Sequence, residues 1–151
     1  MRSFSLFALL ALGLWAMQAP AGVAHIQSPA KVSAPGHSTV TAVFHVSIDS
    51  GFHIQSNHPK LDYLIPSSIA LKPDHGVAVA RVEWPKAEDH KFSFAADPLA
   101  VFEGKLAVPV VLKTGAAGVA RLHGTFRYQA CNDQLCRPPV NVPLTLEVAV
   151  R

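Results

Sequence analysis

Residues 140–150, VNVPLTLEVAV, carry an apolar side chain at every second position. The apolar positions are Val140, Val142, Leu144, Leu146, Val148 and Val150. A period of two is typical of a β-strand that buries one face and exposes the other. This segment therefore indicates a fold that is built from sheets.

The same alternation recurs elsewhere along the chain. It is clear in residues 40–48, 106–112 and 120–128, and weaker in residues 52–55, 69–71 and 77–84. Pro109 has no backbone N–H to donate to a neighbouring strand, so we expect an edge strand or a β-bulge there. No segment shows the 3.6-residue period of a helix over a useful length.

The spacing of these segments predicts the architecture. Roughly seven to nine short strands, separated by Gly and Pro at intervals of about 10–15 residues, favour an antiparallel β-sandwich over a small barrel. The 151 residues are half apolar and 15% charged, which fits one globular domain and excludes a disordered chain or a coiled coil. We expect a single all-β domain over residues 22–151.

The first 21 residues have the features of an export signal. Arg2 supplies a positive charge, residues 4–17 are mostly apolar, and Ala19-Pro20-Ala21 offers small residues to a signal peptidase. A second cleavage position follows Ala24. The apolar run of about 14 residues is shorter than the roughly 20 that span a bilayer. We expect a signal peptide over residues 1–21, no membrane insertion of the mature chain, and an oxidising compartment in which disulfides persist.

The chain has two cysteines, Cys131 and Cys136, within the segment YQACNDQLCRPP of residues 128–139. On one continuous strand their Cα atoms would be about 16 Å apart, whereas a disulfide requires roughly 4.4–6.8 Å. The two cysteines can bond only if residues 132–135 turn back, and Asn132-Asp133 is suitable turn chemistry.

Such a pair has two interpretations. As a structural staple, a six-residue ring would stabilise the domain by only about 2 kcal/mol. As a redox pair, a tight ring in a loop is open to attack by a thiolate. The small ring favours redox exchange, and the structural staple remains the alternative interpretation. Two thiols do not complete a zinc site, and His53 and His58 lack further ligands at metal spacing, so we predict no metal and no cofactor.

The segment from Tyr128 to Pro139, followed by Val142-Pro143-Leu144, resembles the N-terminal periplasmic domain of the thiol:disulfide interchange protein DsbD. Upstream segments are similar to the same family, namely GFHIQSN at 51–57, YLIP at 63–66, VFEG at 101–104 and VPV at 108–110. The similarity covers about residues 27–148. This chain departs from the family at Arg137, where an aromatic or aliphatic residue is common, and in its four-residue loop between the cysteines.

The resemblance implies an immunoglobulin-like sandwich whose cysteine pair relays electrons between periplasmic thiol–disulfide proteins, a chemistry that serves cytochrome c biogenesis. The implied partners are a membrane electron carrier and thioredoxin-like proteins. We expect a stand-alone domain, because the membrane and thioredoxin-like domains of complete DsbD are absent from this sequence. The resemblance also implies a cap loop over the pair, here residues 92–99, with Cys136 joined to the partner and Cys131 as the resolver.

Three residues are candidates for tuning the pair. An imidazolium at His53 or the guanidinium of Arg137 would favour a thiolate. The alternatives are a surface arginine and a partly exposed strand histidine, since Phe52 and Ile54 take the inward positions in an ordinary register. Tyr128 is expected in or near the core, with its hydroxyl at the rim.

Three further residues belong to the implied cap. Phe92 and Phe94 alternate around Ser93, so a strand with two core aromatics is the alternative to a cap. Asp97 would alter the pKa of the thiols if the cap packs over them. Otherwise it is a solvated acidic residue in a loop.

Two functions from different classes follow. The first is a periplasmic thiol–disulfide exchange module, a component of a protein-disulfide reductase. The second is a non-enzymatic sandwich that binds a protein or ligand and uses the disulfide only as a staple. A nucleic-acid partner is not expected, because the net charge is only +3 and Lys and Arg form no run or stripe.

Overall fold

The computed structural model describes residues 22–151, and the predicted signal peptide lies outside the described residues. The strands are β1 (Ala24–Gln27), β2 (Val32–Ala34), β3 (Thr39–Ile48), β4 (His53–Gln55), β5 (Ser68–Leu71), β6 (Ala78–Val82), β7 (Glu88–His90), β8 (Leu99–Phe102), β9 (Lys105–Lys113), β10 (Gly118–Tyr128), β11 (Ala130–Cys131) and β12 (Val140–Val150). In this range no helix is long and apolar enough to cross a membrane.

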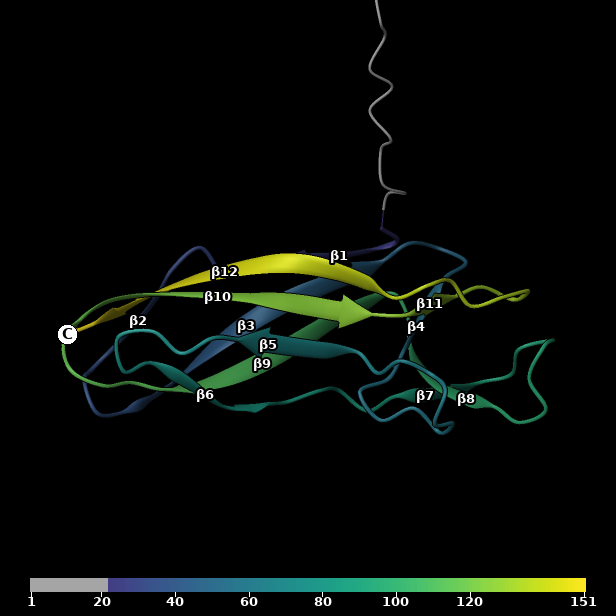
Figure 1. Cartoon of the computed structure of the whole chain (residues 1–151), viewed down its shortest axis with the longest axis horizontal. Helices are drawn as coiled ribbons and strands as arrows, with labels where there is room; N and C mark the ends of the chain where they lie inside the picture. Colours follow the sequence, from purple (N-terminus) through teal and green to yellow (C-terminus); the bar gives the residue numbers. More distant parts are fainter. Residues whose placement is uncertain (1–21) are drawn as a thin grey trace, which may run out of the picture.

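Two four-stranded sheets form the body of the molecule. One has the order β1-β3-β9-β6 and the other the order β2-β12-β10-β5, and all pairs are antiparallel except β2 with β12. Figure 1 shows β10 and β12 running over β3 and β9. The predicted all-β sandwich is therefore confirmed. The number of strands exceeds the predicted seven to nine, because several strands have only two to four residues and carry little periodicity.

The core lies between these two sheets and uses the alternate positions that the sequence marks as apolar. Its most deeply buried members are at most 1% exposed and include Phe44, Val46, Val108, Val110, Leu122, Phe126, Leu146 and Val148. Burial of one such side chain contributes roughly 1.5–3 kcal/mol, so the period-two pattern in the four long strands accounts for most of the drive to form the sandwich.

Pro109 does not lie on an edge strand, because β9 is paired on one side with β3 and on the other with β6. The Pro109 carbonyl accepts a hydrogen bond from the Glu83 N–H at 2.8 Å, just beyond the end of β6. A strand residue directs its N–H and C=O to the same side. The missing N–H of Pro109 thus faces the β6 side of the strand, at a position beyond the end of β6. The β-bulge lies in β6 itself, between Val79 and Arg81.

A third sheet, of order β11-β4-β8-β7, closes one end of the sandwich. Figure 1 shows it at the end of the molecule opposite the C-terminus. Every residue of β4 and of β8 is buried, so neither strand has the exposed face that produces alternation. This sheet holds the first cysteine, in β11, next to β4.

Candidate functional site

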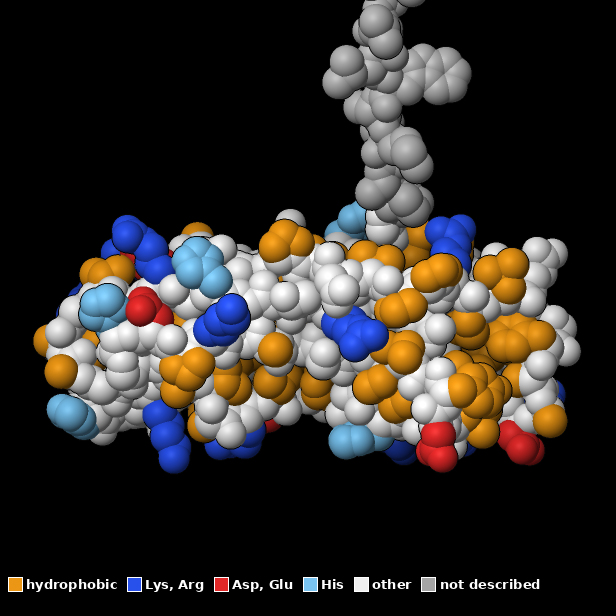
Figure 2. All heavy atoms as spheres, viewed as in Figure 1, with side chains coloured by type: hydrophobic (Ala, Val, Ile, Leu, Met, Phe, Trp, Pro, Cys, Tyr) orange, Lys and Arg blue, Asp and Glu red, His pale blue; other side chains and the backbone are white. Residues whose placement is uncertain are grey.

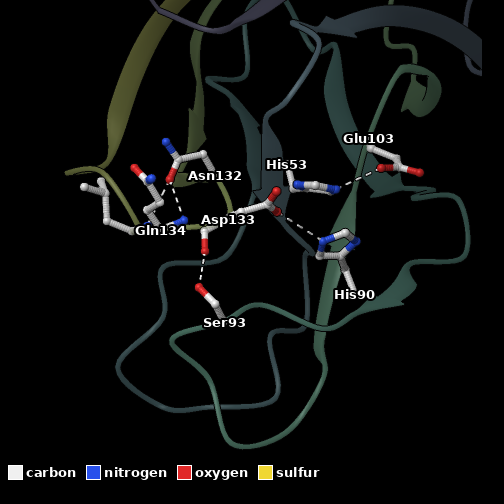
Figure 3. Close-up of polar contacts among 8 residues, drawn as sticks. His53, His90, Ser93, Glu103, Asn132, Asp133 and Gln134 are labelled. Atoms are coloured by element: carbon white, nitrogen blue, oxygen red, sulfur yellow. Dashed lines mark hydrogen bonds and ion pairs between the residues drawn. The ribbon is translucent and has the colours of Figure 1, made fainter.

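Cys131 and Cys136 form a disulfide across a turn, and their Cα atoms are 3.9 Å apart. The turn is held by Asn132, whose side-chain oxygen accepts hydrogen bonds from the N–H groups of Gln134 and Leu135 at 3.0 and 2.9 Å. The Asn132 N–H also donates to the Leu135 carbonyl. Figure 3 shows this Asn132 side chain folded over the loop. The predicted turn and disulfide are confirmed, and Asn132 supplies the turn chemistry.

The two cysteines have different surroundings. Cys131 is fully buried and pairs in the sheet with His53, whereas Cys136 is half-buried. Cys131 belongs to a small apolar cluster that is separate from the main core and also contains Leu64, Phe92, Leu99 and Val101, with Leu61, Ala95 and Cys136 packed against it. Of the two cysteines, Cys136 is therefore the more exposed residue.

Gln55 is a polar neighbour of Cys131 that sequence reasoning missed. Its side chain is fully buried in β4, and its Nε2 donates a hydrogen bond to Cys131 Sγ at 3.1 Å. A donor aimed at sulfur stabilises a thiolate more than a thiol or a disulfide sulfur. The sequence holds no signal for this contact, because Gln55 follows Ile54 in a segment that reads as a half-exposed strand.

His53 is buried, and the expectation of a partly exposed strand histidine is wrong. The expectation assumed one solvent-facing side, but both faces of β4 are covered. The His53 Nε2 lies 2.9 Å from the Glu103 carboxylate, and its Nδ1 has no hydrogen-bond partner within residues 22–151. Its ring centroid lies 4.0 Å from that of His90 and 5.3 Å from that of Phe92.

The segment after β7 packs against Cys131 through Phe92 and forms no strand. Phe92 is buried in the small cluster with Cys131, while Phe94 is 43% exposed, with the two rings 5.2 Å apart. The Ser93 hydroxyl donates to the backbone carbonyl of Asp133 in the cysteine loop (Figure 3). The alternative of a strand with two core aromatics is thus wrong, because only Phe92 is buried and the backbone turns here.

The remaining three candidates differ in their contacts. The Arg137 guanidinium carbon lies 4.3 Å from the ring centroid of Phe52, so the charge rests on an aromatic face. Tyr128 is fully buried in the main core, and its hydroxyl accepts from the Ala24 N–H at 3.3 Å instead of lying at the rim. Asp97 is exposed and forms no ion pair with any described residue.

Apolar side chains gather on the surface around the cysteine pair. Figure 2 shows more hydrophobic side chains at this end than in the middle of the same face. Tyr63, Phe94 and Leu135 are 74%, 43% and 51% exposed, and each lies in a loop next to the pair or in the pair's own loop. A hollow beside Arg137 is lined largely by apolar residues, among them Val23, Ala130, Pro138 and Pro139.

Fold and site together define the class: an immunoglobulin-like β-sandwich with a disulfide-bonded cysteine pair at one end and a neighbouring segment packed against it. The model of the family "Thiol:disulfide interchange protein DsbD, N-terminal" matches residues 23–147. The chain belongs to this family, and the family resemblance of the sequence is confirmed.

Two solved structures are similar to the chain. The N-terminal periplasmic domain of ScsB from Proteus mirabilis is 17% identical with a TM-score of 0.61, and 86% of this chain and 49% of that chain are covered. The chain thus spans about half the length of that domain. The N-terminal domain of DsbD from Neisseria meningitidis, in the reduced form, is 14% identical with a TM-score of 0.49, over 73% of this chain and 78% of that chain. No curated protein matches the chain.

Proposed function

We propose that this domain exchanges electrons with thiol–disulfide proteins of the periplasm through Cys131 and Cys136. The proposal rests on the placement of the pair: a six-residue ring at the end of the sandwich, outside the main core, with one sulfur buried and the other half-buried. A ring in this place adds little to the stability of the sandwich and is open to a docked thiol.

The chemistry runs in two displacements. In the reduced domain, the Cys136 thiolate attacks one sulfur of a partner's disulfide, forming a mixed disulfide and releasing the partner's other sulfur as a thiolate. The Cys131 thiolate then attacks Cys136 Sγ, which closes the Cys131–Cys136 bond and releases the second partner thiolate. Two electrons pass to the partner, and the domain is left oxidised. A second thiol protein must return it to the reduced state.

The surroundings of the pair suit a protein partner. Tyr63, Phe94 and Leu135 leave apolar surface exposed around the disulfide, and exposed apolar patches of this kind mark protein-binding surfaces. The segment after β7 packs on Cys131 through Phe92, and it would have to move aside for a partner to dock at the cysteine pair. The family membership supports a membrane electron carrier and thioredoxin-like proteins as partners, and a periplasmic location.

The reduction potential tests the proposal against the staple. The oxidised domain is equilibrated with glutathione buffers, and the disulfide fraction is measured after acid quenching. A potential of about −180 to −270 mV is the range of redox-active pairs, whereas a value below about −300 mV is typical of structural disulfides and would overturn the proposal.

The double variant Cys131→Ser, Cys136→Ser supplies the matching control. It should fold and lose no more than about 2 kcal/mol of unfolding free energy in urea, since the ring is small. It should also lose all exchange with a thioredoxin-like protein. A double variant that fails to fold would support the staple instead.

A further inference from the structure

Three side chains with metal-ligand chemistry meet beside the disulfide. His53 comes from β4, His90 from the end of β7, and Glu103 directly follows β8. One potential ligand atom of each lies within 4.8 Å of the others. Figure 3 shows the His53 ring directed at Glu103 and the His90 ring beside it. In the sequence these residues are spread over 51 positions, so no motif with metal-ligand spacing predicts them.

The protein's own hydrogen bonds do not use all of this donor capacity. His53 is 7% exposed, and its Nδ1 is a buried ring nitrogen without a partner among the described residues. The ring nitrogen of His53 beside Glu103 is Nε2, so an ion in the cluster would bind Nε2 and leave the buried Nδ1–H for a water. His90 has a further partner, since its Nε2 lies 3.6 Å from the Asp133 carboxylate. A carboxylate behind a histidine is how metal-ligating imidazoles are oriented.

The cluster can be reached by a cation from solvent. A shallow hollow opens beside His53 and Glu103, and its lining residues also include Asp49 and Glu88. None of the Lys and Arg side chains in the described part of the chain lines this hollow. Asp49 is paired with His25 at 3.1 Å, and the negative charge of the three acidic residues together raises the local concentration of positive ions.

We propose that His53, His90 and Glu103 bind a divalent transition-metal ion of the Zn²⁺ type. Two imidazoles and one carboxylate form a donor set that Zn²⁺ accepts with a fourth position left open. Nitrogen donors are poor ligands for Mg²⁺ and Ca²⁺, which require oxygen, so the site discriminates against these ions. The ion would tie β7, which leads into the Phe92 segment, to β4 and the end of β8. This proposal does not depend on electron exchange by the cysteines.

Isothermal titration calorimetry of the oxidised chain, purified after export, tests the site. The disulfide keeps both thiols from binding metal, and a free-thiol assay confirms that state. We expect one Zn²⁺ per chain and no binding of Mg²⁺. Because His90 and Glu103 are the more exposed ligands, His90→Ala and Glu103→Gln should leave the fold intact and weaken Zn²⁺ binding at least about tenfold.

The control is His58→Ala, which removes an exposed histidine outside the cluster and should leave Zn²⁺ affinity unchanged. Nuclear magnetic resonance spectra of the histidine rings give a second measurement that needs no variant. The ring signals of His53 and His90 should shift on addition of Zn²⁺, and that of His58 should not. Equal affinity in all three variants, a loss confined to His58→Ala, or unshifted His53 and His90 signals would overturn the proposal.

Discussion

At the scale of single residues, the two cysteines are made unequal by what touches them. Cys131 lies in β11, fully buried, with Gln55 donating to its sulfur. Cys136 lies across the turn and is half-buried. An exchange pair needs this asymmetry, because one sulfur must meet the partner while the other waits within reach to displace it.

The asymmetry predicts which variant traps a partner. Cys131→Ser should accumulate a covalent adduct through Cys136, because the accessible thiol remains and the resolving thiol is gone. Cys136→Ser should accumulate none, because Cys131 is shielded from a partner. Non-reducing gels of extracts quenched with a thiol-alkylating reagent report the adducts. Adducts in Cys136→Ser alone would reverse the assignment of the two cysteines. Adducts in neither variant would contradict the proposed electron exchange.

Gln55 should set part of the reduction potential. Gln55→Leu removes the donor to Cys131 Sγ, which destabilises the reduced pair more than the disulfide. Loss of about 1 kcal/mol of hydrogen bonding corresponds to a potential about 20 mV more negative. Equilibration with glutathione measures the shift, and Gln27→Leu, on an exposed position of β1, is the control. An unchanged or less negative potential in Gln55→Leu would contradict this role.

Sequence reasoning reaches some of these residues and not others. The cysteines, the turn and its Asn132 could be predicted because spacing and turn chemistry are local properties. The buried state of His53 and Gln55 could not, because it depends on a third sheet whose strands are distant in sequence. Glu103 and His90 were missed for the same reason, since only the pairing of β4, β8 and β7 brings them to His53.

At the scale of elements, the segment after β7 is linked to the cysteine loop by few contacts. Phe92 provides the apolar anchor, and Ser93 provides a single hydrogen bond to the Asp133 carbonyl. The segment also closes on itself, because the Lys91 ammonium donates to the carbonyls of Ala95 and Ala96. A cover that is internally held and weakly attached can move as a unit.

Removal of the Ser93 contact should therefore open access to the disulfide. Ser93→Ala loses one hydrogen bond of about 1 kcal/mol, which corresponds to roughly a fivefold faster reduction by dithiothreitol if opening limits the rate. Timed acid quenching measures that rate. The matched control is Ser33→Ala, whose hydroxyl also donates to a backbone carbonyl but lies in β2. Equal rates in the two variants would show that this contact does not hold the cover.

The long strands illustrate what patterns reveal at this scale. β3, β9, β10 and β12 were predicted from a period of two, which arises when one face is buried and the other is wet. β8 is buried on both faces, so its sequence has no alternation, and β1, β2 and β7 are too short to show one. The position of β9 inside its sheet, despite Pro109, follows from where β6 ends and not from any local signal.

At the scale of the whole molecule, the chain near the predicted cleavage site is part of the fold. Val23 and Ala24 are 8% and 3% exposed and belong to the main core. The Val23 carbonyl accepts from the Asp49 N–H at 2.9 Å, and Ala24 pairs with Ile48 in the sheet. The buried hydroxyl of Tyr128 accepts from the Ala24 N–H. The first strand of the sandwich thus needs both residues.

These contacts favour one of the two signal-peptidase cleavage positions that the sequence offers. Cleavage after Ala21 leaves Gly22 at the new N-terminus and keeps the core contacts. Cleavage after Ala24 would start the chain at His25, remove Val23 and Ala24, and leave the Tyr128 hydroxyl buried without its donor. Burial of a valine alone contributes roughly 1.5–3 kcal/mol, so a chain beginning at His25 should unfold in urea with about 2 kcal/mol less free energy than one beginning at Gly22. We therefore expect the exported protein to begin at Gly22, and its intact mass decides the matter. A mass that corresponds to a His25 start would contradict this expectation, as would an intact Met1 on a chain retained in the membrane fraction.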